Sequence, residues 1–332
     1  MFVEHAADVD VAIVIVNFRT AGATIEAVGG LSADLEELRD SRVIVVDNAS
    51  GDDSLQRLQE AFGDPKWRGR VEVADAGRNG GFGSGVNVGI ARALALDPAL
   101  RYVYILNPDA VIAPGALLAL VRFMESHPDA GMLGNEVRNR GADVTRGFRF
   151  PTVWSELEGA ASFGPLSRLL RKHAVPVSPA ESCEVDWVSG VSMLVRREVF
   201  STVGLFDEDF FLYFEEVDLA KRLQSAGFKT YFVADIVVDH VGGLSTGFKD
   251  ETRRMPGYWF DSRRRYFVKH HGRLYAVACD AARLCGYALF KAKIAVSSRT
   301  YSLRPSFGRD LLRYSVANFL KAAPGTPTRA RG

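Results

Sequence analysis

Cysteine is scarce in this sequence, and it forms no motif. The 332 residues contain three cysteines, Cys183, Cys279 and Cys285, and no two of them are spaced as C-x-x-C. An odd number of widely spaced cysteines argues against a disulfide framework and favours reduced thiols in a cytosolic protein. Residues 1–10 hold acidic side chains and no apolar run, so we expect no secretory signal there.

The sequence also lacks the two commonest nucleotide-binding signatures. Its glycine-rich run, 80–85, does not complete G-x-G-x-x-G, does not follow the first expected strand and precedes no lysine of a phosphate-binding loop. The run is therefore a flexible turn or a stretch of backbone that a nucleotide can approach closely. We favour the second interpretation, because Asn79 and Asn87 flank the run with hydrogen-bonding side chains.

Internal repeats and low-complexity segments are missing as well, but the charge is unevenly divided. Hydrophobic residues make up 47% and charged residues 24%, which is typical of a globular protein. The net charge is +1, yet the residues from Arg263 onward hold 15 Lys and Arg against two Asp. This segment carries +13 and the rest −12, an asymmetry that indicates an anionic partner for a basic C-terminal extension.

Apolar, β-branched runs alternate with helical patterns in the first 126 residues. We expect strands at 11–16, 42–47, 71–74 and 101–106, and helices at 21–40, 54–62, 86–96 and 114–126. This alternation predicts an α/β fold, with a mostly parallel sheet and helices on both faces. Ligands of such sheets bind outside the carboxyl ends of the strands, where the pattern places Asn17, Asp47 and Asp109.

The second half of the chain has a less regular pattern. Residues 148–184 show weak periodicity and several prolines, which is typical of loops and short helices. After them we expect strands at 191–195 and 229–238, and helices at 197–203 and 216–226.

Asp109 and His240 each follow an apolar strand and together could hold a divalent cation. Taken alone, Asp109 could equally cap a helix, and a single histidine near a strand is usually structural. Mg²⁺ takes few protein ligands and completes its shell with substrate phosphates, whereas Mn²⁺ tolerates imidazole better.

The densest group of carboxylates is Glu215, Glu216 and Asp218, which open a helical pattern. Carboxylates in a first helical turn are stabilised by the helix dipole, which is one explanation for them. The aromatic residues at 210–214 suggest partial burial instead, and burial would raise a carboxyl pKa toward the value that a general base needs.

Five motifs follow one another along the chain. They are Asp47-Asn-Ala-Ser, Asn79-Gly-Gly-Phe-Gly with Asn87, Leu106-Asn-Pro-Asp109, the run from Gly204 to Leu219, and His240-Val-Gly-Gly. Together they resemble the family 2 glycosyltransferases, in the rhamnosyltransferase-like branch of bacterial cell-surface polysaccharide synthesis, and the similarity spans about residues 11–270.

The resemblance implies a GT-A fold, which is a Rossmann-like sheet flanked by helices, in a catalytic domain at 1–262 with a basic helical extension at 263–332. It implies that Asp47 binds the base of the donor nucleotide, and that Asp109 and His240 bind Mg²⁺ or Mn²⁺. Glu216 falls where the family usually has the aspartate of Glu-Asp-x-Asp, the catalytic base. The longer side chain leaves open whether Glu215 or Glu216 reaches the acceptor.

These assignments give two further groups of residues. We expect the donor nucleotide near Asn17, Asp47, Asn79, Gly81 and Asn87. By the layout of the family, the acceptor lies near Asp186, Trp187 and Gly190, although Trp187 could equally belong to the core.

The predicted reaction is the inverting transfer of a hexose, L-rhamnose from dTDP-rhamnose by the family branch, to a hydroxyl of a glycan or a polyprenyl-diphosphate-linked acceptor. A nucleoside diphosphate leaves readily once its charge is neutralised, so a single base, Glu216 with Asp218 in support, suffices. The alternatives are a nucleotidyltransferase that makes a nucleotide sugar and a non-catalytic carbohydrate- or nucleotide-binding module.

Charged residues within 274–301 exclude an ordinary membrane-spanning helix. We expect the extension to lie on an anionic membrane surface. The alternatives are a helical pair that packs on the catalytic domain and a contact with a second subunit in a homodimer. No nucleic-acid-binding module accompanies its basic residues, so nucleic acid is not an expected partner. These expectations place the protein in the cytoplasm, at the inner face of the plasma membrane.

Overall fold

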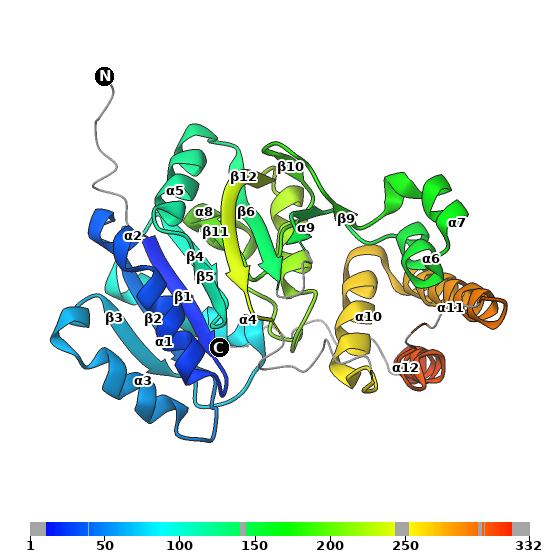
Figure 1. Cartoon of the computed structure of the whole chain (residues 1–332), viewed down its shortest axis with the longest axis horizontal. Coiled ribbons are helices and arrows are strands. Elements are labelled where there is room, and N and C mark those ends of the chain that lie inside the picture. Colours follow the sequence, from blue (N-terminus) through cyan, green and yellow to red (C-terminus); the bar gives the residue numbers. More distant parts are fainter. Residues whose placement is uncertain are drawn as a thin grey trace, which may run out of the picture. The chain divides into compact units, whose positions relative to one another are not determined.

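A computed structural model (Figure 1) describes residues 11–38, 40–139, 144–242, 252–297, 301 and 303–320, the side chains of 318–320 excepted. The expectation for residues 1–10 and the end of the predicted extension, 321–332, lie outside these ranges. The chain forms two compact units, one from residues before 151 and from 175–249, the other from 151–174 and from 250 onward. These units differ in extent from the predicted domains 1–262 and 263–332, which stay a prediction.

The first unit is built on one mixed sheet, whose order among the described residues is β10-β12-β6-β11-β4-β1-β2-β3. The short β5 (Ala110–Ile112) pairs with β12, and β7 (Val144–Thr145) pairs with β6. The eight ordered strands are β1 (Val11–Asn17), β2 (Arg42–Asp47), β3 (Val71–Asp75), β4 (Tyr102–Leu106), β6 (Ala130–Asn139), β10 (Cys183–Val185), β11 (Ser192–Arg196) and β12 (Lys229–His240). Strands β3, β2, β1 and β4 are parallel, β11 is antiparallel to its neighbours, and β6 and β12 are parallel to each other. The predicted mostly parallel α/β sheet is confirmed.

Helices cover both faces of this sheet. They are α1 (Ala21–Gly30), α2 (Ser32–Glu37), α3 (Ser54–Phe62), α4 (Phe82–Leu96), α5 (Ala116–Ser126), α8 (Arg197–Val203) and α9 (Glu215–Ser225), with a 3-10 turn η1 at Pro65–Trp67. Alternate residues of β1 enter two separate cores, since Ile13 packs with α1, α2, α3 and α5, and Val14 packs with α4, α8 and α9. Strand residues buried on both faces explain the continuous apolar runs.

The glycines of α4 let this helix lie close on the sheet. A Cβ atom at Gly85 would lie 2.7 Å from Val16, and one at Gly89 would lie 2.4 Å from Val14. The N-terminus of α4 is thereby held beside the carboxyl end of β1, where ligands of such sheets bind.

Three sequence expectations need correction. The helix expected at 21–40 is two helices that meet at Leu31, and α4 begins at Phe82 rather than at 86. The long strand β6 was not predicted, because its glycines lower strand propensity. Those glycines make room for neighbours, since a Cβ at Gly134 would lie 2.4 Å from Val188.

The second unit is helical. It contains α6 (Val153–Ala161), α7 (Gly164–Leu169), a 3-10 turn η2 (Arg171–His173), α10 (Gly257–His271), α11 (Arg273–Ala295) and α12 (Phe307–Leu320). Helices α6 and α11 pack closely, because a Cβ at Gly286 would lie 2.4 Å from the carbonyl oxygen of Leu157. In the described part of the chain, no helix has the length and apolar character needed to cross a membrane. The short strands β8 (Gly147–Phe148) and β9 (Pro176–Val177) pair in the first unit.

A buried ionic cluster holds the second unit together. Arg263 is 1% exposed, and its guanidinium donates to Oε2 of Glu156 at 2.8 Å and to Oδ1 of Asp280 at 2.5 Å. Arg283 donates to the same Glu156 oxygen, and Arg264 donates to Asp280. Part of the positive charge of the C-terminal segment is therefore neutralised inside the unit.

Candidate active site

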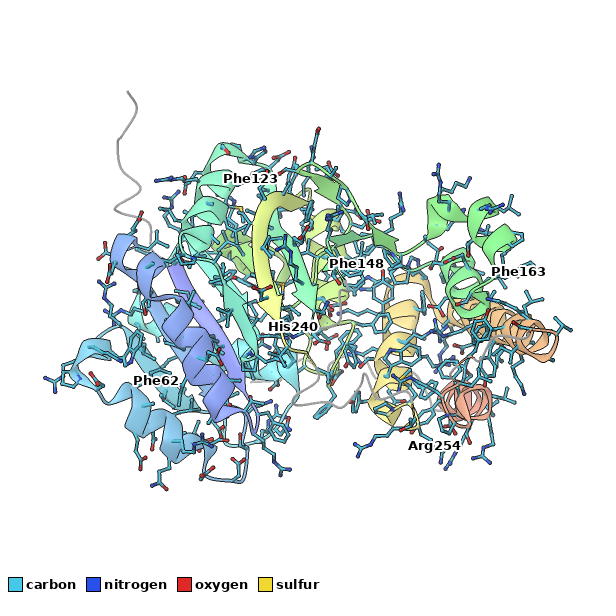
Figure 2. The ribbon with its side chains drawn as sticks, in the orientation of Figure 1. Phe62, Phe123, Phe148, Phe163, His240 and Arg254 are labelled. Atoms are coloured by element: carbon cyan, nitrogen blue, oxygen red, sulfur yellow. The ribbon has the colours of Figure 1, made fainter. Side chains whose placement is uncertain are left out.

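Asp109 and His240 meet at one edge of the sheet. Strand β5 pairs antiparallel with the end of β12, which sets His240 opposite Ala110. Oδ1 of Asp109 lies 3.1 Å from Nε2 of His240, and the two side chains are 8% and 11% exposed. Figure 2 labels His240 at the end of β12.

The carboxylate of Asp109 is held in its ionised form. Burial opposes ionisation, but the hydrogen bond and charge of His240 outweigh it and hold the pKa of Asp109 below its usual value. The backbone N–H of Gly242 also donates to Oδ2 at 3.0 Å. A buried, ionised carboxylate is a hard oxygen ligand.

The surroundings of His240 suit a metal ligand. Its Nδ1 lies 2.8 Å from Oδ1 of Asn139, an acceptor, so Nδ1 carries the proton. Nε2 then faces Oδ1 of Asp109, and a divalent cation bound to both atoms would take the place of this contact. No group of three His, Cys, Asp or Glu suited to a metal ion occurs in the described ranges. Because the pair supplies two protein atoms, a cation held by it would keep positions for water and phosphate oxygens.

The ends of β1 and β2 are tied together by a buried network. Nδ2 of Asn17 donates to Oδ1 of Asp47 at 2.7 Å, while Oδ1 of Asn17 accepts from Thr20 and Thr24. Asp47 also accepts from the N–H and the hydroxyl of Ser50. Asn17 therefore uses its amide to fix Asp47, which keeps acceptor capacity on its carboxylate.

The glycine-rich turn is fixed from two sides. Gly81 has φ +92°, and a Cβ there would lie 1.9 Å from the carbonyl oxygen of Phe211, so only glycine fits. Oδ1 of Asn79 accepts from the N–H of Gly81 and from Nδ2 of Asn48. Within the described residues, Oδ1 of Asn48 is buried without a hydrogen-bond partner. Asn48 was not singled out from the sequence, although it directly follows Asp47.

Asn87 joins α4 to the loop before α9. Its amide donates to the carbonyl oxygen of Phe206 at 2.9 Å and accepts from the N–H of Phe206 at 3.0 Å. Glu208 accepts from Asn87, Ser84 and Arg78. These contacts give Asn87 and the unpredicted Glu208 a positioning role between the glycine-rich turn and the acidic loop.

Glu215 and Glu216 open α9, where Glu215 is buried and Glu216 is half-buried. Burial raises the pKa of Glu216 to about 7, and burial together with the charge of Glu216 raises the pKa of Glu215 well above its usual value. Oε2 of each is buried without a hydrogen-bond partner among the described residues. A Cβ at Gly83 would lie 3.6 Å from Cβ of Glu215, so the pair lies beside the first turn of α4. The expected partial burial of these carboxylates is therefore observed.

The backbone before this pair is strained. Tyr213 and Phe214 have φ of +68° and +71°, which bulky residues rarely adopt. Asp218 is fully buried and accepts from Nε of Arg222 at 2.8 Å. Arg222 also donates to the carbonyl oxygens of Val203 and Leu205. Asp218 thus anchors the helix that carries the two glutamates.

The predicted acceptor residues support the segment 148–150. Trp187 stacks on Phe148 with ring centroids 3.9 Å apart and donates from Nε1 to the carbonyl oxygen of Arg149. Asp186 accepts from the N–H of Phe150 at 2.8 Å. A Cβ at Gly190 would lie 3.6 Å from the ring of Phe82 at the start of α4.

One series of contacts joins the parts of the site. The N–H of Asn107 donates to the carbonyl oxygen of Val191, next to Gly190, and Gly190 lies against Phe82. The N–H of Phe82 in turn donates to the carbonyl oxygen of Phe211. The metal-ligand candidates, the glycine-rich turn and the acidic loop therefore belong to one edge of one sheet.

The fold is the GT-A fold of glycosyltransferases. A mannosyltransferase from Pyrobaculum calidifontis, solved with GDP-mannose and Mn²⁺, superposes with a TM-score of 0.55 at 15% identity, covering 93% of this chain and 87% of that one. GalNAc-T7 with UDP, GalNAc and Mn²⁺ gives a TM-score of 0.52 at 16% identity over 90% of this chain and 58% of that one.

The chain belongs to glycosyltransferase family 2, because residues 8–265 match the model described as glycosyltransferase-like family 2. The N-acetylglucosaminyl-diphospho-decaprenol L-rhamnosyltransferase of Mycobacterium tuberculosis is 32% identical over 230 residues, 65% of this chain and 71% of the relative. Rhamnosyltransferase WbbL of Escherichia coli is 31% identical over 160 residues, 46% of this chain and 58% of the relative. The predictions of the family and of a glycosyltransferase enzyme are confirmed, and the two alternative functions are set aside.

Proposed function

We propose that this enzyme transfers L-rhamnose from dTDP-rhamnose, with inversion, to a hydroxyl of a polyprenyl-diphosphate-linked glycan. The observation that carries the proposal is the Glu215–Glu216 pair beside the glycine-rich turn, in which Glu215 is buried, Glu216 is half-buried and the pKa of Glu216 is raised to about 7. A group half ionised near neutral pH is suited to accept a proton.

Glu216 is the base in this proposal. Its carboxylate takes the proton of the acceptor hydroxyl while the hydroxyl oxygen forms a bond to the anomeric carbon. The bond from that carbon to the diphosphate breaks at the same time, and its electron pair leaves with the nucleoside diphosphate. Attack from the face opposite the leaving group inverts the anomeric configuration.

The raised pKa of Glu215 suits it to be a hydrogen-bond donor and not the base. Burial, and after it the charge of Glu216, raise the pKa of Glu215 well above its usual value, which favours a protonated Glu215 beside an ionised Glu216. A protonated Glu215 can donate a hydrogen bond to the acceptor. Asp218 holds both residues in place through Arg222.

Asp109 and His240 would hold the divalent cation, which when bound supplies a Lewis acid for the diphosphate leaving group. Asp47 and the free Oδ1 of Asn48 would accept hydrogen bonds from the nucleoside, and Asn79 fixes the turn at Gly81 that the diphosphate approaches. Asp186, Trp187 and Gly190 would border the acceptor.

The named lipid-linked substrate of the mycobacterial relative supports an acceptor anchored in a membrane. An enzyme acting on it must work at the membrane surface, which we place at the inner face of the plasma membrane. The basic extension would contribute through the cations that the internal carboxylates do not neutralise.

The test is transfer from a panel of dTDP-, UDP- and GDP-sugars to a short-chain polyprenyl-diphosphate-N-acetylglucosamine, with Mn²⁺ or with a chelator. The expected result is a rhamnosylated product from dTDP-β-L-rhamnose. NMR of this product should show an α-glycosidic bond to the transferred rhamnose. A product from another donor would overturn the donor assignment, and a β product would overturn inversion.

A further inference from the structure

The outer face of α11 is apolar, and its charged residues point inward. Between Leu274 and Leu289 the charged residues are Asp280 and Arg283, and both turn toward the buried ionic cluster. On the opposite side the helix exposes large side chains in the described structure. Their exposed fractions are 84% for Leu274, 41% for Val277 and 48% for Leu289, and Val296, the residue after the helix, is 88% exposed.

The exposed face follows a heptad spacing. Its small and apolar positions alternate in steps of four and three residues, and all are exposed: Leu274, Ala278, Ala281, Cys285, Ala288, Ala292 and Ala295. A repeat of 3.5 residues is the signature of a helix that packs along another helix. Alanine and cysteine at these positions let two helix backbones approach closely.

A lipid surface fits this face less well than another helix. Interfacial helices insert bulky side chains into the bilayer, whereas the middle of this face is alanine and cysteine. The exposed face also has few cations, Arg273 at its start and Lys291 near its end. Its length, about 33 Å for a helix of this size, matches the contact of two long helices.

We propose that α11 is the contact between two copies of this chain, packed as an antiparallel helix pair about a twofold axis. The charges favour this direction, because a parallel pair would set Arg273 and Lys291 opposite their own copies. In the antiparallel pair Arg273 lies near the C-terminal end of the other helix, where the dipole favours a cation.

The size of the face sets the strength of the pair. Four large and several small exposed side chains offer on the order of 600 Å² per copy, somewhat below the roughly 800 Å² that each partner of a specific complex commonly buries. The dimer is therefore expected to dissociate on dilution.

The symmetry makes Cys285 a direct probe. Cys285 is exposed and lies at the midpoint between Leu274 and Val296. In an antiparallel twofold pair the midpoint of one helix faces the midpoint of the other. The two Cys285 thiols should then be close enough for a short bismaleimide to join them.

The experiment combines sedimentation velocity of the full chain, over roughly a hundredfold range of concentration, with this crosslink. We expect a monomer–dimer equilibrium and a covalent dimer that Cys285→Ala abolishes and Cys183→Ala retains. Ala288→Glu should remove both, because it places two charges in the contact. Ala119→Glu, at an exposed position of α5, is the matched control and should change neither.

A monomer at all concentrations without a Cys285 crosslink would overturn the proposal. It would equally be overturned if Ala288→Glu left the dimer intact. In a parallel assay of binding to anionic vesicles, a loss of vesicle binding by Ala288→Glu with unchanged self-association would show that the face contacts lipid and not a second copy. Circular dichroism checks that each variant is folded, and Ala281→Glu repeats the test should Ala288→Glu misfold.

Discussion

Oδ1 of Asp109 lies 3.1 Å from Nε2 of His240, although the two residues belong to distant parts of the chain. The antiparallel pairing of β5 with β12 brings them together. Nδ1 of His240 is in turn fixed by Asn139 at the end of β6. Three strands thus position one carboxylate and one imidazole, which is an arrangement suited to a divalent cation.

Asp109→Asn should lower turnover at least about 100-fold and raise the Mn²⁺ concentration needed for half-maximal activity, because it removes the charged ligand. Asn139→Ala should weaken Mn²⁺ activation about tenfold with a smaller loss of maximal turnover, because it frees the imidazole without removing it. Rates measured against Mn²⁺ concentration separate the two. An unchanged Mn²⁺ dependence in Asp109→Asn would exclude this residue as a ligand.

Gly81→Ala should weaken binding of the donor nucleotide at least about tenfold, or about 1.4 kcal/mol. The added Cβ would lie 1.9 Å from the carbonyl oxygen of Phe211 and must displace the turn or the acidic loop. Gly77→Ala is the matched control, because Gly77 also has positive φ but a Cβ there meets nothing within 4 Å. Titration calorimetry with dTDP measures both, and equal effects of the two variants would show that backbone strain alone is responsible.

Arg263→Met should destabilise the second unit by about 3–5 kcal/mol, because it leaves Glu156 and Asp280 with less compensation in a buried position. The charges of Arg263 and Arg283 outweigh burial and lower the pKa of Glu156. A lowered pKa contributes stability above the unfolded-state value, which is lost as the pH falls through the folded-state value. The wild type should therefore unfold more readily at acid pH. Thermal melts of both proteins from acid pH below the folded-state pKa of Glu156 up to pH 8 test this, and a difference that does not shrink toward the acid end would contradict it.

The sequence predicted the strands of the first half well because these strands are buried on both faces. Residues 11–16 of β1 are all apolar, so this run cannot be confused with the alternating faces of a surface helix. Strand β6 was not recognised because the need for glycine at 131 and 134 comes from tertiary contacts. A Cβ at Gly131 would meet Phe228 and one at Gly134 would meet Val188, and both neighbours are distant in the chain. Asn139, at its end, was missed for the same reason.

The candidate site was predictable where a residue acts through its chemical type and position after a strand. The pairing of Asp109 with His240 follows from such positions. The contacts of Asn87 with Phe206, and the inward direction of Arg263, depend on tertiary packing that no local pattern encodes. A segment that is basic in sequence can therefore have part of its positive charge neutralised by buried carboxylates in the folded protein.

Glu216→Gln should lower turnover by about 10²–10⁴-fold and leave donor binding near normal, because the amide keeps the shape but cannot take a proton. Wild-type turnover should fall as the pH drops through about 7, the pKa of Glu216, because protonation removes the base. Stopped assays over pH 5–9 give both results. If Glu215→Gln lost activity to this extent while Glu216→Gln did not, the base would be Glu215.

Glu216→Gln should lower turnover but raise the stability of the folded protein. Burial raises the pKa of Glu216 above its unfolded value, so the folded state loses stability as the pH rises from about 4.5 to about 7. Glu216→Gln removes this loss and should melt a few degrees higher than the wild type at pH 8, with no difference near pH 4. Higher stability with lower activity is the expected signature of a buried base. A lower melting temperature at pH 8 would show that the carboxylate is stabilised by its surroundings, and that its burial is not what tunes it for proton transfer.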